Sequence, residues 1–152
     1  MLMFLDTGPL GMLSNPAATK KTKELAEWMT AQLDKGVRFF IPEVSDYEVR
    51  RNAILENLTG CLQRLDELTT TITYVPLTTS AMREAARLWA TVRGRGQPTA
   101  PKEELDCDAI LAAQAITTSK DSEEVIIVTD NIGHLSRFET ATVKAMNWRD
   151  IP

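Results

Sequence analysis

The stretch MLMFLDTGPL at residues 1–10 decides the fold, because five apolar residues run without a break into an acid, Asp6. An apolar run of this length is typical of a strand that is buried on both faces of a parallel sheet. The stretch VIIVTD at residues 125–130 repeats the pattern and ends on Asp130. Further apolar, β-branched or aromatic runs predict three more strands, at residues 37–41, 72–75 and 142–146.

Helical patterns separate these runs. The first begins at Asn15-Pro16, a polar cap followed by proline, and ends at Gly36. The others cover residues 43–58, 61–69 and 79–93 and a segment that starts near 106. Strands that alternate with helices predict an α/β fold in which helices cover both faces of a parallel sheet. The length of 152 residues and the 43% hydrophobic content match a single domain over residues 1–152.

Composition restricts the class of protein. No apolar run approaches the ~20 residues that span a bilayer, and the N-terminus lacks the basic start of a signal peptide, so we expect a cytoplasmic protein without a membrane segment. The net charge of −4 argues against a protein that holds nucleic acid by bulk positive charge. Cys61 and Cys107, with His134 as the only histidine, cannot complete a four-ligand zinc site, so we expect buried or inert thiols.

Four carboxylates stand where predicted strands end or predicted helices begin: Asp6, Glu48, Asp108 and Asp130. In a parallel sheet these positions meet at the C-terminal edge, where α/β folds bind ligands, so we expect the four acids to converge. Converging acids repel one another unless a cation holds them ionised, and Mg²⁺ or Mn²⁺ suits oxygen ligands. Such ions activate water against phosphodiesters. Neighbours suited to orienting ligands or water are Thr7, Asp106, Thr129 and Asn131.

Each acid also has a purely structural explanation. Asp6 and Asp130 are suited to capping the loops that follow their strands. Asp106 or Asp108 is suited to capping the helix that begins there. Ser45-x-x-Glu48 matches a capping box.

The choice between Asp106 and Asp108, and the role of His134, also bear on the predicted site. Asp106 and Asp108 lie about 200° apart around a helix, so regular helical geometry points only one of them into the site. His134 follows Asp130 by four positions and is a candidate general base or phosphate contact, although a loop or helix-cap role fits it better.

Four segments carry a family resemblance that covers nearly the whole chain: FLDTGPL at 4–10, IPEVSDYEVRR at 41–51, DCDAILAAQA at 106–115, and VTDNIGHLSRF at 128–138, which is followed by an Asn-Trp pair. Together they resemble the PIN-domain family, in particular the VapC-type ribonucleases of bacterial toxin-antitoxin pairs. The resemblance implies a three-layer α/β/α fold with a five-stranded parallel sheet and an RNA-cutting activity that depends on Mg²⁺ or Mn²⁺. It maps the family's acids onto Asp6, Glu48, Asp108 and Asp130, and favours Asp108 over Asp106. It also implies a homodimer and a cognate antitoxin partner.

Two functional hypotheses from different classes follow. The first is a metal-dependent endoribonuclease, the toxin of a toxin-antitoxin pair, with an RNA backbone held by Arg50, Arg51, Arg93, Arg95 and Lys102. The second is a PIN-like module that binds RNA or protein without cutting, which the presence of all four acids disfavours. A haloacid-dehalogenase-like phosphatase requires an Asp where this chain has Gly8, and a response-regulator receiver requires a Lys where it has Asp130.

Overall fold

Parallel strands form one sheet in the computed structural model, which describes residues 1–96, 105–119 and 123–152. Within that part of the chain the sheet has five strands in the order β3-β2-β1-β4-β5, and every neighbouring pair is parallel. The strands are β1 (Leu2–Leu5), β2 (Arg38–Pro42), β3 (Thr73–Val75), β4 (Val125–Val128) and β5 (Val143–Met146). The predicted strands are confirmed to within one residue at each end, because each is a short apolar run with no helical period.

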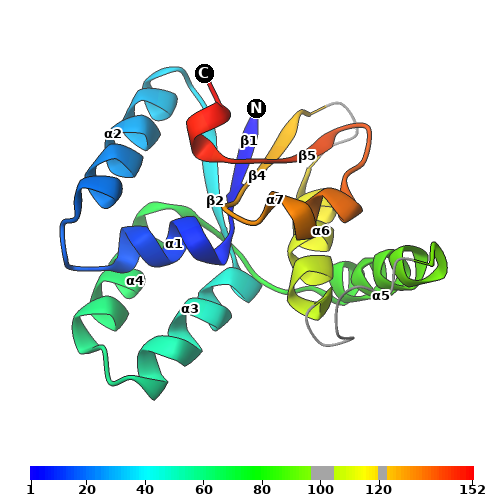
Figure 1. The fold of residues 1–152 in the computed structure, drawn as a ribbon, viewed down its shortest axis with the longest axis horizontal. Coiled ribbons are helices and arrows are strands. Elements are labelled where there is room, and N and C mark those ends of the chain that lie inside the picture. The colour runs from blue at the N-terminus through cyan, green and yellow to red at the C-terminus, as the bar shows by residue number, and fades with distance from the viewer. Residues whose placement is uncertain (97–104, 120–122) are drawn as a thin grey trace.

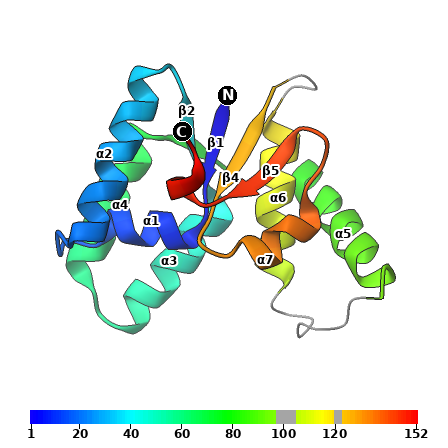
Figure 2. The ribbon, with the colours of Figure 1, turned by 45° about the horizontal axis from the view of Figure 1, so that its top comes forward.

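Helices cover both faces of the sheet, which confirms the three-layer α/β/α architecture (Figures 1 and 2). On one side lie α1 (Thr7–Ser14), α2 (Lys20–Asp34), α3 (Glu43–Leu55) and α4 (Thr59–Thr71). On the other lie α5 (Thr79–Gly94), α6 (Asp106–Thr118) and α7 (Ile132–Leu135). Short 3₁₀ turns follow at Ser136–Phe138 and Trp148–Asp150.

Each strand divides its side chains between two cores. In β1, Met3 and Leu5 pack with α1, α2 and α4, whereas Leu2 and Phe4 pack with α5 and α6. Phe4 also stacks on Phe40 of β2, with the ring centroids 4.9 Å apart. This division explains why β1 and β4 are apolar throughout: a strand buried on both faces has no position for a polar side chain.

The prediction that the first helix begins at Asn15-Pro16 is wrong. A separate helix, α1, begins directly after β1, and Asn15 is the residue that ends it. The Asn15 side chain accepts a hydrogen bond from the backbone N–H of Ala17 at 2.9 Å, which makes a turn rather than a helix start. Two glycines and a proline in TGPLGMLS obscure the helical pattern, yet proline is tolerated in a first turn and Leu10 and Leu13 are buried.

Helix α2 begins at Lys20, and Thr19 is its N-cap. The Thr19 hydroxyl accepts a hydrogen bond from the backbone N–H of Thr22 at 3.2 Å. We predict that Thr19→Ala lowers the free energy of unfolding by about 1 kcal/mol, because one N–H of the first turn then has no partner. Urea unfolding of Thr19→Ala beside Thr19→Ser measures this; equal stability of the two variants would contradict the cap.

The sheet order places a crevice between β1 and β4. The chain passes from β1 towards β2 on one side, whereas β4 and β5 lie on the other, so the order reverses at the β1/β4 boundary. Ligands of open α/β sheets bind at such reversals, outside the carboxyl ends of the strands. Leu5 pairs with Val128 there, and the Asp6 N–H donates to the Val128 carbonyl at 3.0 Å. The residues that follow both strands therefore meet at this crevice.

The part of the chain that the structure describes contains no helix long and apolar enough to span a bilayer.

Candidate active site

Asp6 lies at the end of β1 and is fixed by two hydrogen bonds. Its Oδ1 accepts from the backbone N–H of Thr7 and its Oδ2 accepts from the Thr129 hydroxyl, both at 2.7 Å. Asp6 therefore caps helix α1, where the structural explanation predicted that it caps a loop, and it also faces the other acids. Burial raises the pKa of Asp6; the bonds from Thr129 and Thr7 oppose this, and the charges of Glu48 and Asp130 add to it.

Glu48 approaches Asp6 from α3. The Thr7 hydroxyl donates to Glu48 Oε2 at 2.7 Å, so Thr7 holds both acids, one through its backbone and one through its side chain. Arg51 lies one turn along α3 and places a guanidinium nitrogen 3.4 Å from Glu48 Oε1. Glu48 is thus held in place without any role as a helix cap.

The capping box predicted from Ser45 and Glu48 is wrong. Helix α3 starts at Glu43, so Ser45 is inside the helix, and its buried hydroxyl makes no hydrogen bond. The backbone N–H of Val44 instead donates to the side chain of Gln114, which reaches across from α6. A tertiary contact therefore replaces the local cap.

Asp108 enters from the first turn of α6. Leu105 is the N-cap of that helix and makes no side-chain cap bond, so neither Asp106 nor Asp108 caps it. Asp106 is exposed and lies in a groove between α5 and α6 with Met82 and Trp89. Asp108 is the acid that faces Asp6 and Glu48.

The carboxylate of Asp108 has an unusual environment. Its Oδ2 is buried and accepts no hydrogen bond, although His134 Nδ1 lies 3.5 Å away, at ion-pair distance if the imidazole is protonated. Burial raises the pKa of Asp108 to about 6, and the negative charges of Asp6 and Glu48 contribute to the rise, whereas His134 opposes it. His134, expected in a loop or helix-cap role, therefore lies against one of the acids.

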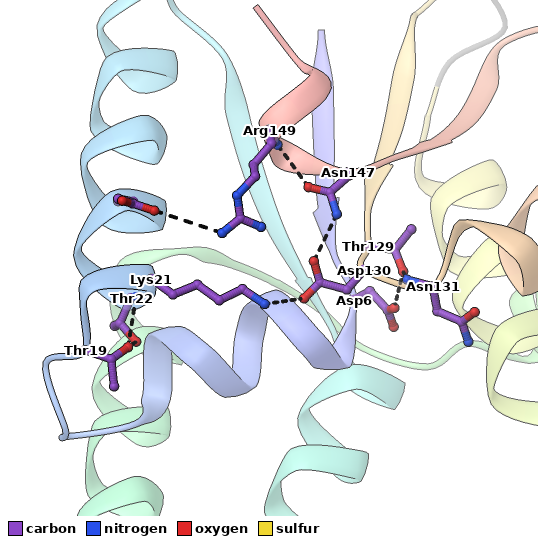
Figure 3. Close-up of polar contacts among 10 residues, drawn as sticks. Asp6, Thr19, Lys21, Thr22, Thr129, Asp130, Asn131, Asn147 and Arg149 are labelled. Carbon is purple, nitrogen blue, oxygen red and sulfur yellow. Dashed lines mark hydrogen bonds and ion pairs between the residues drawn. The ribbon is translucent and has the colours of Figure 1, made fainter.

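Asp130 completes the group from the loop after β4. Its Oδ1 accepts from the Asn147 amide at 3.0 Å, and its Oδ2 lies 3.4 Å from the Lys21 ammonium (Figure 3). A Cβ placed on Gly8 would lie 3.5 Å from the same Oδ2, so the carboxylate rests against the first turn of α1, beside Asp6. Thr129 orients the loop, because its hydroxyl accepts from the N–H of Asn131 at 2.8 Å.

The four acids converge from four separate segments, as each alters the electrostatics of at least one other. As they stand, the side chains of residues 1–96, 105–119 and 123–152 include no group of three or more His, Cys, Asp or Glu close enough to hold a metal together. Mg²⁺, however, keeps several waters and takes only one or two carboxylates in many protein sites. The Oδ2 of Asp108, which accepts no hydrogen bond, and the mutual repulsion of the acids fit a hydrated divalent ion, not a dry cage of three carboxylates.

Comparisons with known proteins identify the fold. No protein-family model matches the chain, and no curated protein matches it. Solved structures that are similar to this chain over nearly their full length include three VapBC structures. VapBC2 from Rickettsia felis, in a structure with a bound DNA fragment from its promoter, aligns at 16% identity with a TM-score of 0.70. The alignment covers 97% of this chain and 99% of that one. VapBC-1 from nontypeable Haemophilus influenzae aligns at 14% identity with a TM-score of 0.68, covering 99% of this chain and 100% of that one. DNA-bound VapBC from Salmonella typhimurium aligns at 17% identity with a TM-score of 0.65, covering 97% of this chain and 99% of that one.

The chain has the PIN fold of VapC proteins. The likeness confirms the predicted resemblance at the level of the fold.

The residues predicted to contact RNA differ in where they lie relative to the four acids. Arg51 lies beside Glu48 with its guanidinium over the Tyr47 ring at 5.1 Å. The Arg50 side chain points to other partners: it pairs with Asp46 at 2.9 Å and with Asp66 of α4 at 2.8 Å, and therefore ties α3 to α4. Arg93 lies over the Trp89 ring, Arg95 follows the end of α5, and Lys102 lies outside the described residues.

Three side chains at the acids were not predicted as site residues. Lys21 and Asn147 hold Asp130, and the Cys107 thiol lies beside Glu48. Burial and the charge of Glu48 raise the pKa of Cys107 to about 11, which agrees with the inert thiol expected from the sequence. The Asn-Trp pair after β5 was a usable signal for Asn147, whereas no local pattern marks Lys21.

The raised pKa of Asp108 predicts that metal-free protein loses stability as the pH rises from about 4 to about 6. In this window the native carboxyl, with its pKa near 6, holds a proton that the unfolded carboxyl, with its pKa of 3.8, has released. We expect a loss on the order of 2 kcal/mol. Urea unfolding in a chelator at pH 4.5 and pH 7 measures it. Asp108→Asn should flatten the profile, and an equally steep profile in that variant would assign the pH dependence to other groups.

Proposed function

We propose that this protein is a Mg²⁺- or Mn²⁺-dependent endoribonuclease. The observation that supports this most is the meeting of Asp6, Glu48, Asp108 and Asp130 at the crevice between β1 and β4, with a buried oxygen of Asp108 left without a hydrogen bond. A site built from acids, with few bases among them, suits a hard cation and a substrate that the cation can bridge.

The position of each side chain determines its proposed role. Asp6, Glu48 and Asp108 would hold the ion, directly or through its waters, with Asp130 as a further ligand or water contact. A bound Mg²⁺ or Mn²⁺ supplies positive charge that polarises the scissile phosphate and makes water a better nucleophile. Thr129 and Thr7 fix Asp6 and Glu48, so these carboxylates need little reorganisation when substrate arrives.

The substrate backbone would approach over the open side of the acids. Arg51 stands there beside Glu48 and is half-exposed, so it is the predicted RNA contact that the site geometry favours most. Arg95 is a more distant candidate, because it lines a separate polar pocket with Arg137 and Glu139. Arg50 is a poor candidate, since two carboxylates already engage its guanidinium.

We propose in addition that the protein is the toxin of a toxin-antitoxin pair, forms a homodimer and is inhibited by a cognate antitoxin. The support is the full-length likeness to chains from VapBC assemblies. Co-expression with the product of an adjacent reading frame, followed by co-purification and a growth assay, tests this part separately from the chemistry.

Cleavage of RNA by the purified protein tests the proposed function. We expect internal cuts with Mn²⁺ or Mg²⁺ and none in EDTA, with restoration when the ion is added back. Sequencing of the RNA ends after brief expression would show the sites that are cut. Uptake of Mn²⁺ without any cleavage, across total RNA, would instead support the non-catalytic binding module.

A further inference from the structure

The start of α2 violates a rule of helix electrostatics. The positive end of the helix dipole lies at the N-terminus, where acids are favoured, yet the first turn of α2 carries Lys20, Lys21 and Lys23 and no acid. Such local conflicts are expected where function requires them. The ion-pair partners of Lys20 and Lys21 lie outside this turn.

Lys20 and Lys21 have different partners. Lys20 pairs with Glu24 one turn along the same helix, at 3.7 Å, and its side chain is 91% exposed. Lys21 reaches 3.4 Å from Oδ2 of Asp130, a residue 109 positions away in the sequence (Figure 3). Lys21 is thus directed at the candidate active site, whereas Lys20 is satisfied on the surface.

Asp130 differs from Asp108 in how its oxygens are occupied. Both Asp130 oxygens have a donor, Asn147 on Oδ1 and Lys21 on Oδ2, whereas Asp108 Oδ2 accepts none. The nearby Arg149 lies over the Trp148 ring at 4.2 Å and pairs with Glu24 at 4.0 Å. The positive charge that compensates Asp130 in the structure therefore comes from Lys21.

We propose that Lys21 is the built-in counter-ion of Asp130. Its ammonium orients this carboxylate and repels a second cation from it, so Asp6, Glu48 and Asp108 hold a single exchangeable divalent ion, and Asp130 contacts that ion through water. This inference rests on the proposed function and adds a positioning residue to it. An ion pair of this exposure is weak by itself, so we expect its effect on stability to be small.

Mn²⁺ titration by calorimetry, without RNA, tests the proposal. We expect the wild type to bind one ion per chain and Lys21→Met to bind Mn²⁺ about fivefold more tightly, because a positive charge near the ion has been removed. Lys20→Met removes the same charge from the same turn and should leave the affinity unchanged, and Lys21→Arg should restore the wild-type value. A merely structural lysine would not give tighter binding when it is lost.

Thermal unfolding in EDTA provides a readout that needs no metal. Lys21→Met should melt about 2 °C below Lys20→Met, and adding Asp130→Asn to Lys21→Met should abolish that difference, because the carboxylate no longer requires a counter-ion.

The two measurements separate the possible failures. Two ions bound to the wild type, or Mn²⁺ affinity in Lys21→Met no higher than in Lys20→Met, would overturn the inference. So would weaker RNA binding in Lys21→Met with unchanged Mn²⁺ affinity, since Lys21 would then be a substrate contact. If the wild type takes up no Mn²⁺, the proposed nuclease function is overturned instead, and the melting difference still decides whether Lys21 compensates Asp130.

Discussion

Asp6→Asn is expected to reduce metal-dependent RNA cleavage by roughly a thousandfold or more, because loss of one central carboxylate removes several kcal/mol of stabilisation that the ion gives to the transition state. The variant should remain folded. Asparagine has the same shape, its carbonyl can still accept from the Thr7 N–H, and burial already disfavours the charged form of Asp6. We therefore expect equal or higher stability in EDTA together with nearly complete loss of cleavage.

Asp106→Asn is the matched control for this experiment. It removes the same charge from an acid that is exposed, lies two residues before Asp108 and points into the groove between α5 and α6. Its cleavage rate should stay within about twofold of wild type, a change of less than ~0.5 kcal/mol in the barrier. Retained cleavage in a clean preparation of Asp6→Asn would remove the basis of the nuclease assignment. A similar loss in both variants would mean that overall charge, not position, governs the rate.

The fold and the convergence of the acids were predictable because both follow from short-range patterns. Buried strands are uninterrupted apolar runs, and the parallel arrangement then forces Asp6 and Asp130 to the same edge of the sheet. Helix α1 was missed because its glycines and proline lower the local helix propensity, whereas burial of Leu10 and Leu13 stabilises it in the folded chain. Tertiary packing decided that segment, and a local pattern does not contain it.

The charged side chains were harder to assign, because their partners lie far away in sequence. Arg50 looks like a free cation in the sequence, yet Asp66 on another helix engages it. Lys21 looks like one lysine in a solvated patch, yet Asp130 is its partner. Whether a cation is available to bind RNA thus depends on contacts that only the three-dimensional structure provides.

Gln114 is the clearest example of such a contact, and its replacement is expected to have the largest effect on stability. The side chain is fully buried on α6. Its Oε1 accepts from the backbone N–H of Val44 at 3.2 Å, and its Nε2 donates to the Val75 carbonyl at 2.7 Å. Gln114 therefore caps α3 and holds it, together with the end of β3, against α6. Helix α3 carries Glu48 and helix α6 carries Asp108.

Gln114→Leu should lower the free energy of unfolding by about 2–4 kcal/mol, because a buried N–H and a buried carbonyl lose their partners together. It should also reduce cleavage per folded molecule by up to about 100-fold, since small displacements of catalytic groups cost this much.

Gln32→Leu is the control: Gln32 is also buried, but it donates to the Pro152 carbonyl, away from the acids. We expect it to destabilise the protein without affecting cleavage by the folded fraction. Urea unfolding and single-turnover cleavage, measured where each variant is folded, separate the two effects. Full activity of folded Gln114→Leu would show that α3 and α6 keep Glu48 and Asp108 in register without this side chain.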